Sequence, residues 1–134
     1  MDTIIEEAGA IVLRKGSIQP EVLLIYSKKR PQIRIFPKGH IEPGETSAEA
    51  AGRELLEEAG VKGKLLEQAG VVTFEFNKKR YRVTYFYFTF LGTISEGEAG
   101  REPRWFSLAD ARMALSLEDL RELVTPVAVE RSFV

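Results

Sequence analysis

Short apolar runs separated by polar turn residues mark the first third of the chain. Residues 8–14 (AGAIVLR) and 21–27 (EVLLIYS) are apolar over almost their whole length, as in strands that are covered on both faces. The polar residues 15–20 between them predict a turn, and a shorter apolar stretch at 33–36 predicts a third strand. We therefore expect this part of the chain to supply strands to the interior of a sheet.

Two longer strand-like runs occupy the middle of the chain, at residues 65–76 and 81–92. The four polar residues between them, Asn-Lys-Lys-Arg, predict a hairpin. Side chains alternate between faces along a strand, so Tyr85 and Tyr87 share one face of the second run, and Phe90 lies on the other. We expect the phenylalanine face to pack in the core and the tyrosine face to be amphipathic.

A helix is predicted between these two groups of strands, over residues 47–59. Thr46 followed by Glu49 is the pattern of a capping box, and Gly60 suits the position that ends a helix. Alanine and leucine side chains recur on one face of this segment, which favours packing on a sheet. Gly52 costs about 1 kcal/mol relative to alanine inside a helix, and a close approach to strand backbone would explain it.

Helical signals return near the C-terminus, after a loop rich in Gly and Glu and a short strand at 104–106. Ser107 and Ser116 are each followed three residues later by aspartate, a capping pattern that predicts two helices. The second is expected to end near Thr125, because a proline follows. The order of these elements favours an α/β fold with a mixed sheet covered on both faces, and the chain 1–134 is expected to form a single domain.

Composition excludes several classes of protein. A length of 134 residues with 44% hydrophobic and 29% charged side chains suits one domain with a real core. The net charge of -1 gives no field that would favour long nucleic acid or a membrane, and no apolar run reaches membrane-spanning length. The absence of cysteine excludes disulfides, thiolate metal sites and a cysteine nucleophile. We expect a cytoplasmic protein, either a monomer or a homodimer, whose opening residues are too acidic for a signal peptide.

Four ionisable residues form a tight cluster inside the predicted helix: Arg53, Glu54, Glu57 and Glu58. Glutamates spaced i, i+3, i+4 share one helix face within about one turn, where like charges oppose helix formation by about 0.2–0.5 kcal/mol per pair. A positive partner is therefore expected, and hard oxygen ligands at this density suit Mg²⁺ or Mn²⁺. The alternative is a solvated helix face stabilised by ion pairs between successive turns.

The acidic cluster belongs to a longer pattern with fixed spacing, GHIEPGETSAEAAGRELLEEAGV, at residues 39–61. This pattern resembles the signature of the Nudix hydrolases, with the sequence Phe-Pro-Lys before it and Trp-Phe near the end of the predicted sheet. The fixed positions of the signature are filled by Gly39, Glu45, Arg53, Glu54, Leu55, Glu57, Glu58, Gly60 and Val61. The resemblance implies an α/β/α sandwich with a mixed sheet between helices, and a metal-dependent hydrolase that directs water at a phosphorus of a nucleoside diphosphate derivative.

The resemblance also implies roles for the residues of the signature. Glu57 and Glu58 match principal metal ligands, and Glu54 matches a residue that shares the metal or acts as general base. Arg53 matches an arginine that orients these carboxylates and pairs with Glu45. The carbonyl of Gly39 is a further expected ligand. A last carboxylate is expected from the loop after the final long strand, where Glu96, Glu98 and Glu102 are candidates and Glu98 is preferred.

Cationic and aromatic side chains outside the signature are candidates for binding the substrate. Lysines and arginines gather at residues 28–38 and 78–82, and we select Lys38, Arg34 and Lys79 from them as phosphate-binding residues. Tyr85 and Tyr87 are candidates for stacking on a nucleobase, with Tyr81 and Phe74 behind them, although a packed aromatic face explains them equally well. His40, the only histidine, is expected near the site as a phosphate contact.

The residues around the signature also suggest a branch of the family. Phe-Pro-Lys-Gly-His followed by Glu-Pro-Gly-Glu is similar to the dinucleoside polyphosphate hydrolases, so the favoured reaction is diadenosine tetraphosphate to ATP and AMP. The stretch at 100–106 (GREPRWF) is similar to diphosphoinositol polyphosphate phosphohydrolases, which usually have Gly-Gly where this chain has Lys38-Gly39. Nucleoside triphosphate hydrolysis, removal of diphosphate from RNA 5′ ends, and a sensor that binds nucleotide without cleaving it remain alternatives.

Overall fold

A computed structural model of the chain describes residues 3–133 and consists of one mixed sheet with helices on both faces. The strands are β1 (Ile4–Lys15), β2 (Pro20–Tyr26), β3 (Arg34–Ile35), β4 (Lys38–His40), β5 (Val61–Phe76), β6 (Lys79–Thr93) and β7 (Arg104–Ser107). The helices are α1 (Ser47–Ala59), α2 (Leu108–Ala114), α3 (Glu118–Glu122) and α4 (Pro126–Phe133). The predicted strands are present, but β1, β5 and β6 are longer than expected and β4 was not predicted.

The sheet runs in the order β3-β2-β1-β6-β5, with β4 paired to β1 and β7 paired to β2. The pairing of β1 with β6 is parallel and extends over ten residue pairs, from Ile4 opposite Arg80 to Leu13 opposite Thr89. All other strand pairings named within residues 3–133 are antiparallel. The expectation of a mixed sheet is therefore confirmed.

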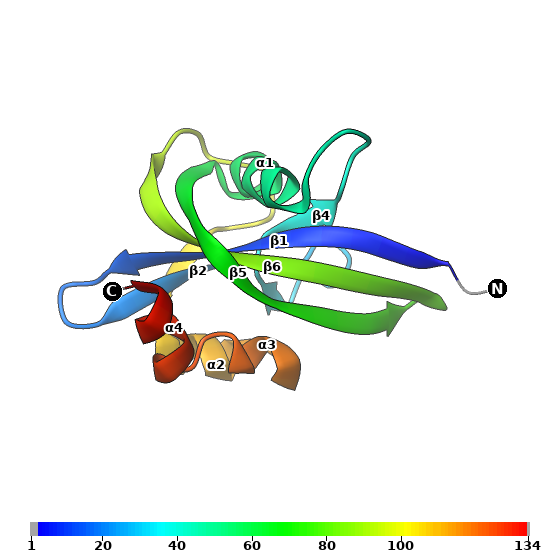
Figure 1. The fold of residues 1–134 in the computed structure, drawn as a ribbon. Coiled ribbons are helices and arrows are strands. Elements are labelled where there is room, and N and C mark those ends of the chain that lie inside the picture. The colour runs from blue at the N-terminus through cyan, green and yellow to red at the C-terminus, as the bar shows by residue number, and fades with distance from the viewer. Residues whose placement is uncertain (1–2, 134) are drawn as a thin grey trace.

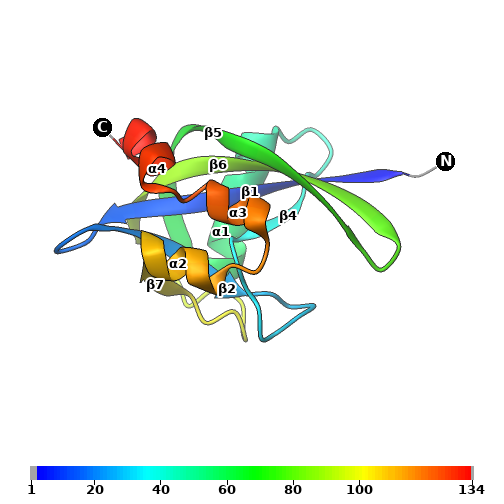
Figure 2. The same ribbon diagram turned by 90° about the horizontal axis from the view of Figure 1, so that it is seen from below.

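The helices divide between the two faces of the sheet. α1 covers one face, and α2, α3 and α4 lie on the opposite face (Figures 1 and 2). This arrangement is the expected α/β/α sandwich. Within residues 3–133, no helix has both the length and the apolar character that crossing a bilayer requires.

The bounds of α1 agree with the sequence prediction because its signals are local. The Thr46 side chain accepts from the backbone N–H of Glu49, and the Glu49 side chain accepts from the N–H of Thr46, so the capping box is complete. Gly60 ends the helix in the left-handed region, at φ 69°. A Cβ on Gly52 would meet nothing nearer than the Phe88 ring, at 3.8 Å, so the expected close approach of strand backbone there is wrong.

Two apolar cores, one on each face of the sheet, explain why both faces of β6 are buried. Phe86 and Phe88 pack with α1, whereas Tyr85 and Tyr87 belong to the core under the C-terminal helices. Tyr85 and Tyr87 are only 2% and 3% exposed. The expectation of an amphipathic tyrosine face is wrong, because alternation along one strand does not reveal that helices cover the second face as well.

The C-terminal region differs from its prediction at two points. Ser107 caps α2 as expected, since its side chain accepts from the N–H of Asp110. Ser116 does not cap α3, which begins after Leu117 with no side-chain cap and ends at Glu122 rather than near Thr125. The proline expected to stop this helix is instead the first residue of α4, a position where its missing N–H has no cost.

Candidate functional site

Arg53 connects the parts of the acidic cluster. Its Nε and Nη2 donate to the two carboxylate oxygens of Glu45, at 2.7 and 3.0 Å. Its Nη1 donates to Glu54 at 2.9 Å and to Glu57 at 3.2 Å, and its Nη2 also donates to the carbonyl of His40 at 3.0 Å. All five guanidinium N–H groups are therefore engaged. The hydrogen bonds from Arg53, helped by the backbone N–H of Glu42, lower the pKa of Glu45 to about 2.

Gly39 lies directly against the Glu54 carboxylate. A Cβ at this position would lie 2.6 Å from Oε2 of Glu54 and nearer still to the other two carboxyl atoms. Only glycine leaves space for this packing. The β4 backbone thus forms one wall of a cradle, and the α1 carboxylates form the other.

Glu58 is the most deeply buried acid of the cluster, with 6% of its surface exposed. Its Oε1 accepts from the backbone N–H of Lys38 at 3.0 Å, and its Oε2 accepts from Nη2 of Arg101 at 2.9 Å. Burial raises the pKa of Glu58 to about 7, and the neighbouring Glu54 contributes to the rise, against the opposing effects of Arg101 and the Lys38 N–H.

The loop after β6 brings a further carboxylate to this point. Gly60 and Gly97 both have positive φ, and they approach so closely that a Cβ on either would overlap backbone of the other segment. The N–H of Glu98 donates to the carbonyl of Glu58 at 3.0 Å. The Glu98 side chain accepts from Nε of Arg101 at 2.8 Å, so this one arginine joins Glu58 and Glu98. Partial burial opposes it, but Arg101 and Lys28 together lower the pKa of Glu98.

The donor set fits a hard divalent cation. The Glu54 carboxylate lies against Gly39, and Glu58 accepts from the backbone N–H of Lys38. Arg101 donates to both Glu58 and Glu98, and Glu57 is exposed beside Arg53. Among the described residues, no three His, Cys, Asp or Glu side chains surround a single point in this arrangement. Oxygen donors of this kind are the ligands that Mg²⁺ and Mn²⁺ prefer. Glu54, Glu57, Glu58, Glu98 and the Gly39 carbonyl remain the ligands predicted for such an ion.

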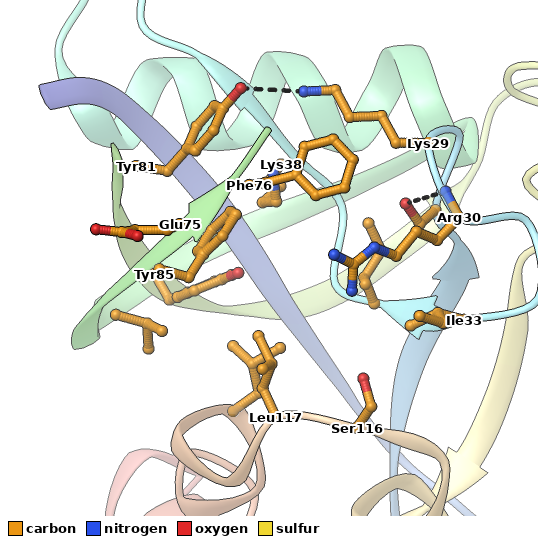
Figure 3. Close-up of a pocket in the computed structure, with 15 residues that line it drawn as sticks. Lys29, Arg30, Ile33, Lys38, Glu75, Phe76, Tyr81, Tyr85, Ser116 and Leu117 are labelled. Atoms are coloured by element: carbon orange, nitrogen blue, oxygen red, sulfur yellow. Dashed lines mark hydrogen bonds between the residues drawn. The ribbon is translucent and has the colours of Figure 1, made fainter. Parts of the chain in front are cut away.

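A pocket of about 150 Å³ opens on the opposite face of the sheet from α1 (Figure 3). Its walls are mostly apolar and come from strands β3, β4, β5 and β6, the segment between β2 and β3, the segment between α2 and α3, and α3. Phe74 and Tyr81 stack in this wall, with ring centroids 5.0 Å apart and planes 7° from parallel. The residues that line it are Ser27, Lys29, Arg30, Ile33, Ile35, Lys38, Val72, Phe74, Glu75, Phe76, Tyr81, Tyr85, Ser116, Leu117 and Leu120.

Three cations lie at this pocket. Lys29 donates to the Tyr81 hydroxyl at 3.2 Å, as Figure 3 shows. Arg30 lies over the Phe76 ring, 4.8 Å from its centroid. Lys38 lies 5.3 Å from the Phe74 centroid, and its backbone N–H reaches Glu58, so this residue joins the pocket to the acidic cluster.

Other predicted substrate residues have different places. Arg34 donates to the carbonyl of Glu102 at 2.6 Å and stacks on Tyr26, and Lys79 is exposed in the β5–β6 hairpin, so neither lines the pocket. Tyr85 lines the pocket but is nearly inaccessible. Tyr87 donates to the carbonyl of Leu123 at 2.5 Å under the C-terminal helices. At 2% and 3% exposure, neither Tyr85 nor Tyr87 presents a ring face on which a base could stack in this structure.

Sequence reasoning missed several residues of the site. Glu7 and Arg101 are buried charges whose contacts depend on pairing between distant segments, so the sequence did not predict a place for either in the site. Lys29 and Arg30 were recognised only as part of a cationic run. Phe76 was assigned to a strand alone, although aromatic residues flanked by cations could have indicated a pocket wall.

The comparison with known families agrees with the geometry of α1 and β4. The family model described as NUDIX domain matches residues 5–126. The chain belongs to the Nudix family.

Related Nudix proteins share a substantial part of the sequence. A human diphosphoinositol polyphosphate phosphohydrolase (NUDT4B) is 42% identical over 111 residues, covering 79% of this chain and 60% of the relative. Rat diphosphoinositol polyphosphate phosphohydrolase 2 is 38% identical over 110 residues, with the same coverage of 79% and 60%. The chain therefore spans about three-fifths of the length of these relatives.

Solved Nudix structures show the same fold at lower identity. An Ap4A hydrolase from Caenorhabditis elegans, in a binary complex, has a TM-score of 0.82 at 24% identity and covers 97% of this chain and 99% of its own. A NUDIX hydrolase from Nitrosomonas europaea has a TM-score of 0.76 at 19% identity, with coverage of 97% and 92%. At these identities the likeness establishes the fold.

Proposed function

We propose that this Nudix protein is a divalent-metal-dependent hydrolase of phosphoanhydride bonds in nucleoside polyphosphates, and that it cuts diadenosine tetraphosphate into ATP and AMP. The observation that carries this proposal is the position of Lys38. Its side chain lies in a cationic pocket with aromatic walls, and its backbone N–H donates to Glu58 of the acidic helix at 3.0 Å. One ligand could thus place a base in the pocket and its phosphates beside the carboxylates.

The chain's own residues divide the work of binding and positioning. Lys29, Arg30 and Lys38 supply charge for the phosphates, and Phe74 and Phe76 supply apolar surface for a nucleobase. Arg53 holds Glu54 and Glu57 in orientation, as the resemblance of the signature implied.

Hydrolysis directs a water molecule at one phosphorus of the polyphosphate. A bound divalent ion would offset the phosphate charge, polarise the phosphoryl oxygen and lower the pKa of a coordinated water. Glu54, Glu57, Glu58, Glu98 and the carbonyl of Gly39 would hold that ion, and Glu54 would share it or accept the proton of the attacking water. Water attacks the phosphorus of the phosphate that becomes AMP. As the new oxygen–phosphorus bond forms, the anhydride bond between the first and second phosphates breaks, and ATP leaves with the oxygen that bridged them. Positioning and electrostatics supply the catalysis.

A second candidate substrate is a diphosphoinositol polyphosphate. The specific observation in its favour is the 38–42% identity to proteins named for that activity. The apolar walls of the pocket argue the other way, because an inositol ring covered with phosphates gains little from aromatic surface. Lys38-Gly39 also replaces the Gly-Gly usual at that point of the diphosphoinositol branch.

Product analysis by ion-exchange chromatography tests the proposal. The protein and Mg²⁺ would be incubated with diadenosine tetraphosphate, a diphosphoinositol phosphate, ATP and a triphosphorylated RNA, each with and without chelator. ATP and AMP from the first substrate, with slow attack on the others and no reaction in chelator, supports the proposal. Preferred cleavage of the inositol substrate would assign the protein to the diphosphoinositol branch of the family and leave the proposed site unchanged. Tight nucleotide binding without cleavage of any substrate would make the protein a sensor.

A further inference from the structure

A buried carboxylate outside the Nudix signature contacts both substrate-side residues of β4. Glu7 lies on β1 and is only 4% exposed. Its Oε1 accepts from Nζ of Lys38 at 2.7 Å, and its Oε2 lies 3.4 Å from Nε2 of His40, whose side chain is 66% exposed and forms an ion pair with Glu7 only when protonated. Its two carboxylate oxygens thus serve two different side chains.

Strand register produces this arrangement. In the antiparallel pairing of β1 with β4, Glu7 is opposite His40 and Gly9 is opposite Lys38. Residues two apart on a strand project to the same face, so Lys38 and His40 flank the Glu7 carboxylate. Gly9 contributes by its lack of a side chain, because a Cβ there would lie 2.5 Å from the Tyr85 ring and 3.1 Å from Cβ of Lys38.

Burying an acid is unfavourable unless its partners compensate for lost hydration, and such an ion pair is weak evidence for stability by itself. The pair of Glu7 and Lys38 is largely withdrawn from water, with side chains 5% and 20% exposed. The ammonium group held by Glu7 lies 5.3 Å from the Phe74 centroid and 5.9 Å from that of Tyr81, against the pocket wall. The carboxylate therefore determines where the cation of β4 points.

We propose that Glu7 is a positioning residue, which holds the Lys38 ammonium and the His40 imidazole in place for the phosphates of the substrate. This inference rests on the proposed function, since it deepens the role of the same pocket. Glu7 acts through its two neighbours and has no part in holding the metal ion.

The kinetic test compares E7Q with E6Q. Glu6 is the adjacent residue of the same strand, but it is 44% exposed and pairs with Arg82 rather than with β4. E7Q removes the charge that holds the Lys38 ammonium, and Lys38 is proposed to bind the phosphates, so E7Q is expected to raise KM for diadenosine tetraphosphate about 10-fold or more with a smaller change in kcat. E6Q should behave as wild type. E7D, which keeps the charge, should recover part of the loss, and it carries the test if E7Q does not fold.

A double-mutant cycle with K38A separates positioning from a general loss of folding. If Glu7 acts through Lys38, most of the effect of E7Q on KM disappears in the K38A background. The effect that remains, which acts through His40, is small. Additive losses, or a fall in kcat with KM unchanged in E7Q, would overturn the proposal because a structural role predicts them.

A spectroscopic arm needs no turnover. His40 is the only histidine, so its imidazole gives a single set of NMR signals. In metal-free protein at constant pH, these signals should move in E7Q and not in E6Q, and added inorganic tripolyphosphate should shift them in wild type and less in E7Q. Unchanged signals in E7Q would refute the role of Glu7. If wild type cleaves no nucleotide, the proposed function fails while this arm still decides the position of His40.

Discussion

Replacing Gly39 by alanine tests whether the cradle between β4 and α1 is the catalytic site. The new methyl group would lie 2.6 Å from Oε2 of Glu54, whereas ordinary contacts begin near about 3.5 Å. The other two carboxyl atoms of Glu54 would lie closer still, so Glu54 must move away by at least about 1 Å, and this movement disrupts its hydrogen bond from Arg53. A displacement of this size can lower turnover by about 100-fold, which corresponds to about 2.7 kcal/mol of lost transition-state stabilisation. Overpacking should also destabilise the fold by about 1–3 kcal/mol.

The assay is steady-state kinetics on diadenosine tetraphosphate across a Mg²⁺ titration, with urea unfolding in parallel. Gly52→Ala is the matched control, because a Cβ there has room beside Phe88 and alanine is the better helix former by about 1 kcal/mol. G52A should be as active as wild type and somewhat more stable. The reasoning is refuted if G39A keeps turnover within about threefold of wild type, or if G52A loses as much.

Three further changes test other parts of the site. Glu57→Gln should abolish most turnover and leave the unfolding curve unchanged, with exposed Glu130→Gln as control; near-normal activity would remove Glu57 from the metal ligands. Lys38→Ala should raise KM more for tetraphosphates than for short diphosphates, and equal effects on both would separate Lys38 from polyphosphate binding. Arg53 holds the pKa of Glu45 at about 2, below its usual 4.5, so this carboxylate contributes stability that is fully present above about pH 4.5 and is lost as pH falls towards 2. In urea unfolding, the free energy of unfolding of E45Q should therefore fall less between pH 6 and pH 3 than that of wild type. An equal fall in both proteins would contradict this role of Glu45.

Local signals in the sequence were enough to predict α1 and the cluster on it. The capping box of Thr46 and Glu49 and the left-handed Gly60 determine where the helix begins and ends without help from distant residues. The spacing of the acidic residues likewise follows from helix geometry alone, so their clustering was predictable.

Features that depend on contacts between distant segments were not predictable in the same way. The contact of Glu7 with Lys38 requires the register between β1 and β4, and the burial of Tyr87 requires helices packed on the second face of the sheet. The sequence predicts that Pro126 ends a helix, whereas Pro126 begins α4. Proline is accepted both just after a helix and at its first position, so the residue alone does not distinguish the two. Arg101 lies in the stretch at 100–106, but that stretch does not predict its hydrogen bond to Glu58, which depends on the close contact of Gly60 with Gly97.

The parallel pairing of β1 with β6 also bears on how the chain reaches this fold. Partners in that pairing are about 76 positions apart, and β2, β4 and all of α1 lie between them in the sequence. Contacts of such long range slow folding, because the entropy of closing the intervening loop is lost before the pairing stabilises it. On a ribosome, α1 would emerge well before β6, the strand that completes the apolar surface under it. The helix that bears the carboxylates is therefore expected to be marginally stable in the nascent chain and to acquire its final packing only when the β5–β6 hairpin docks.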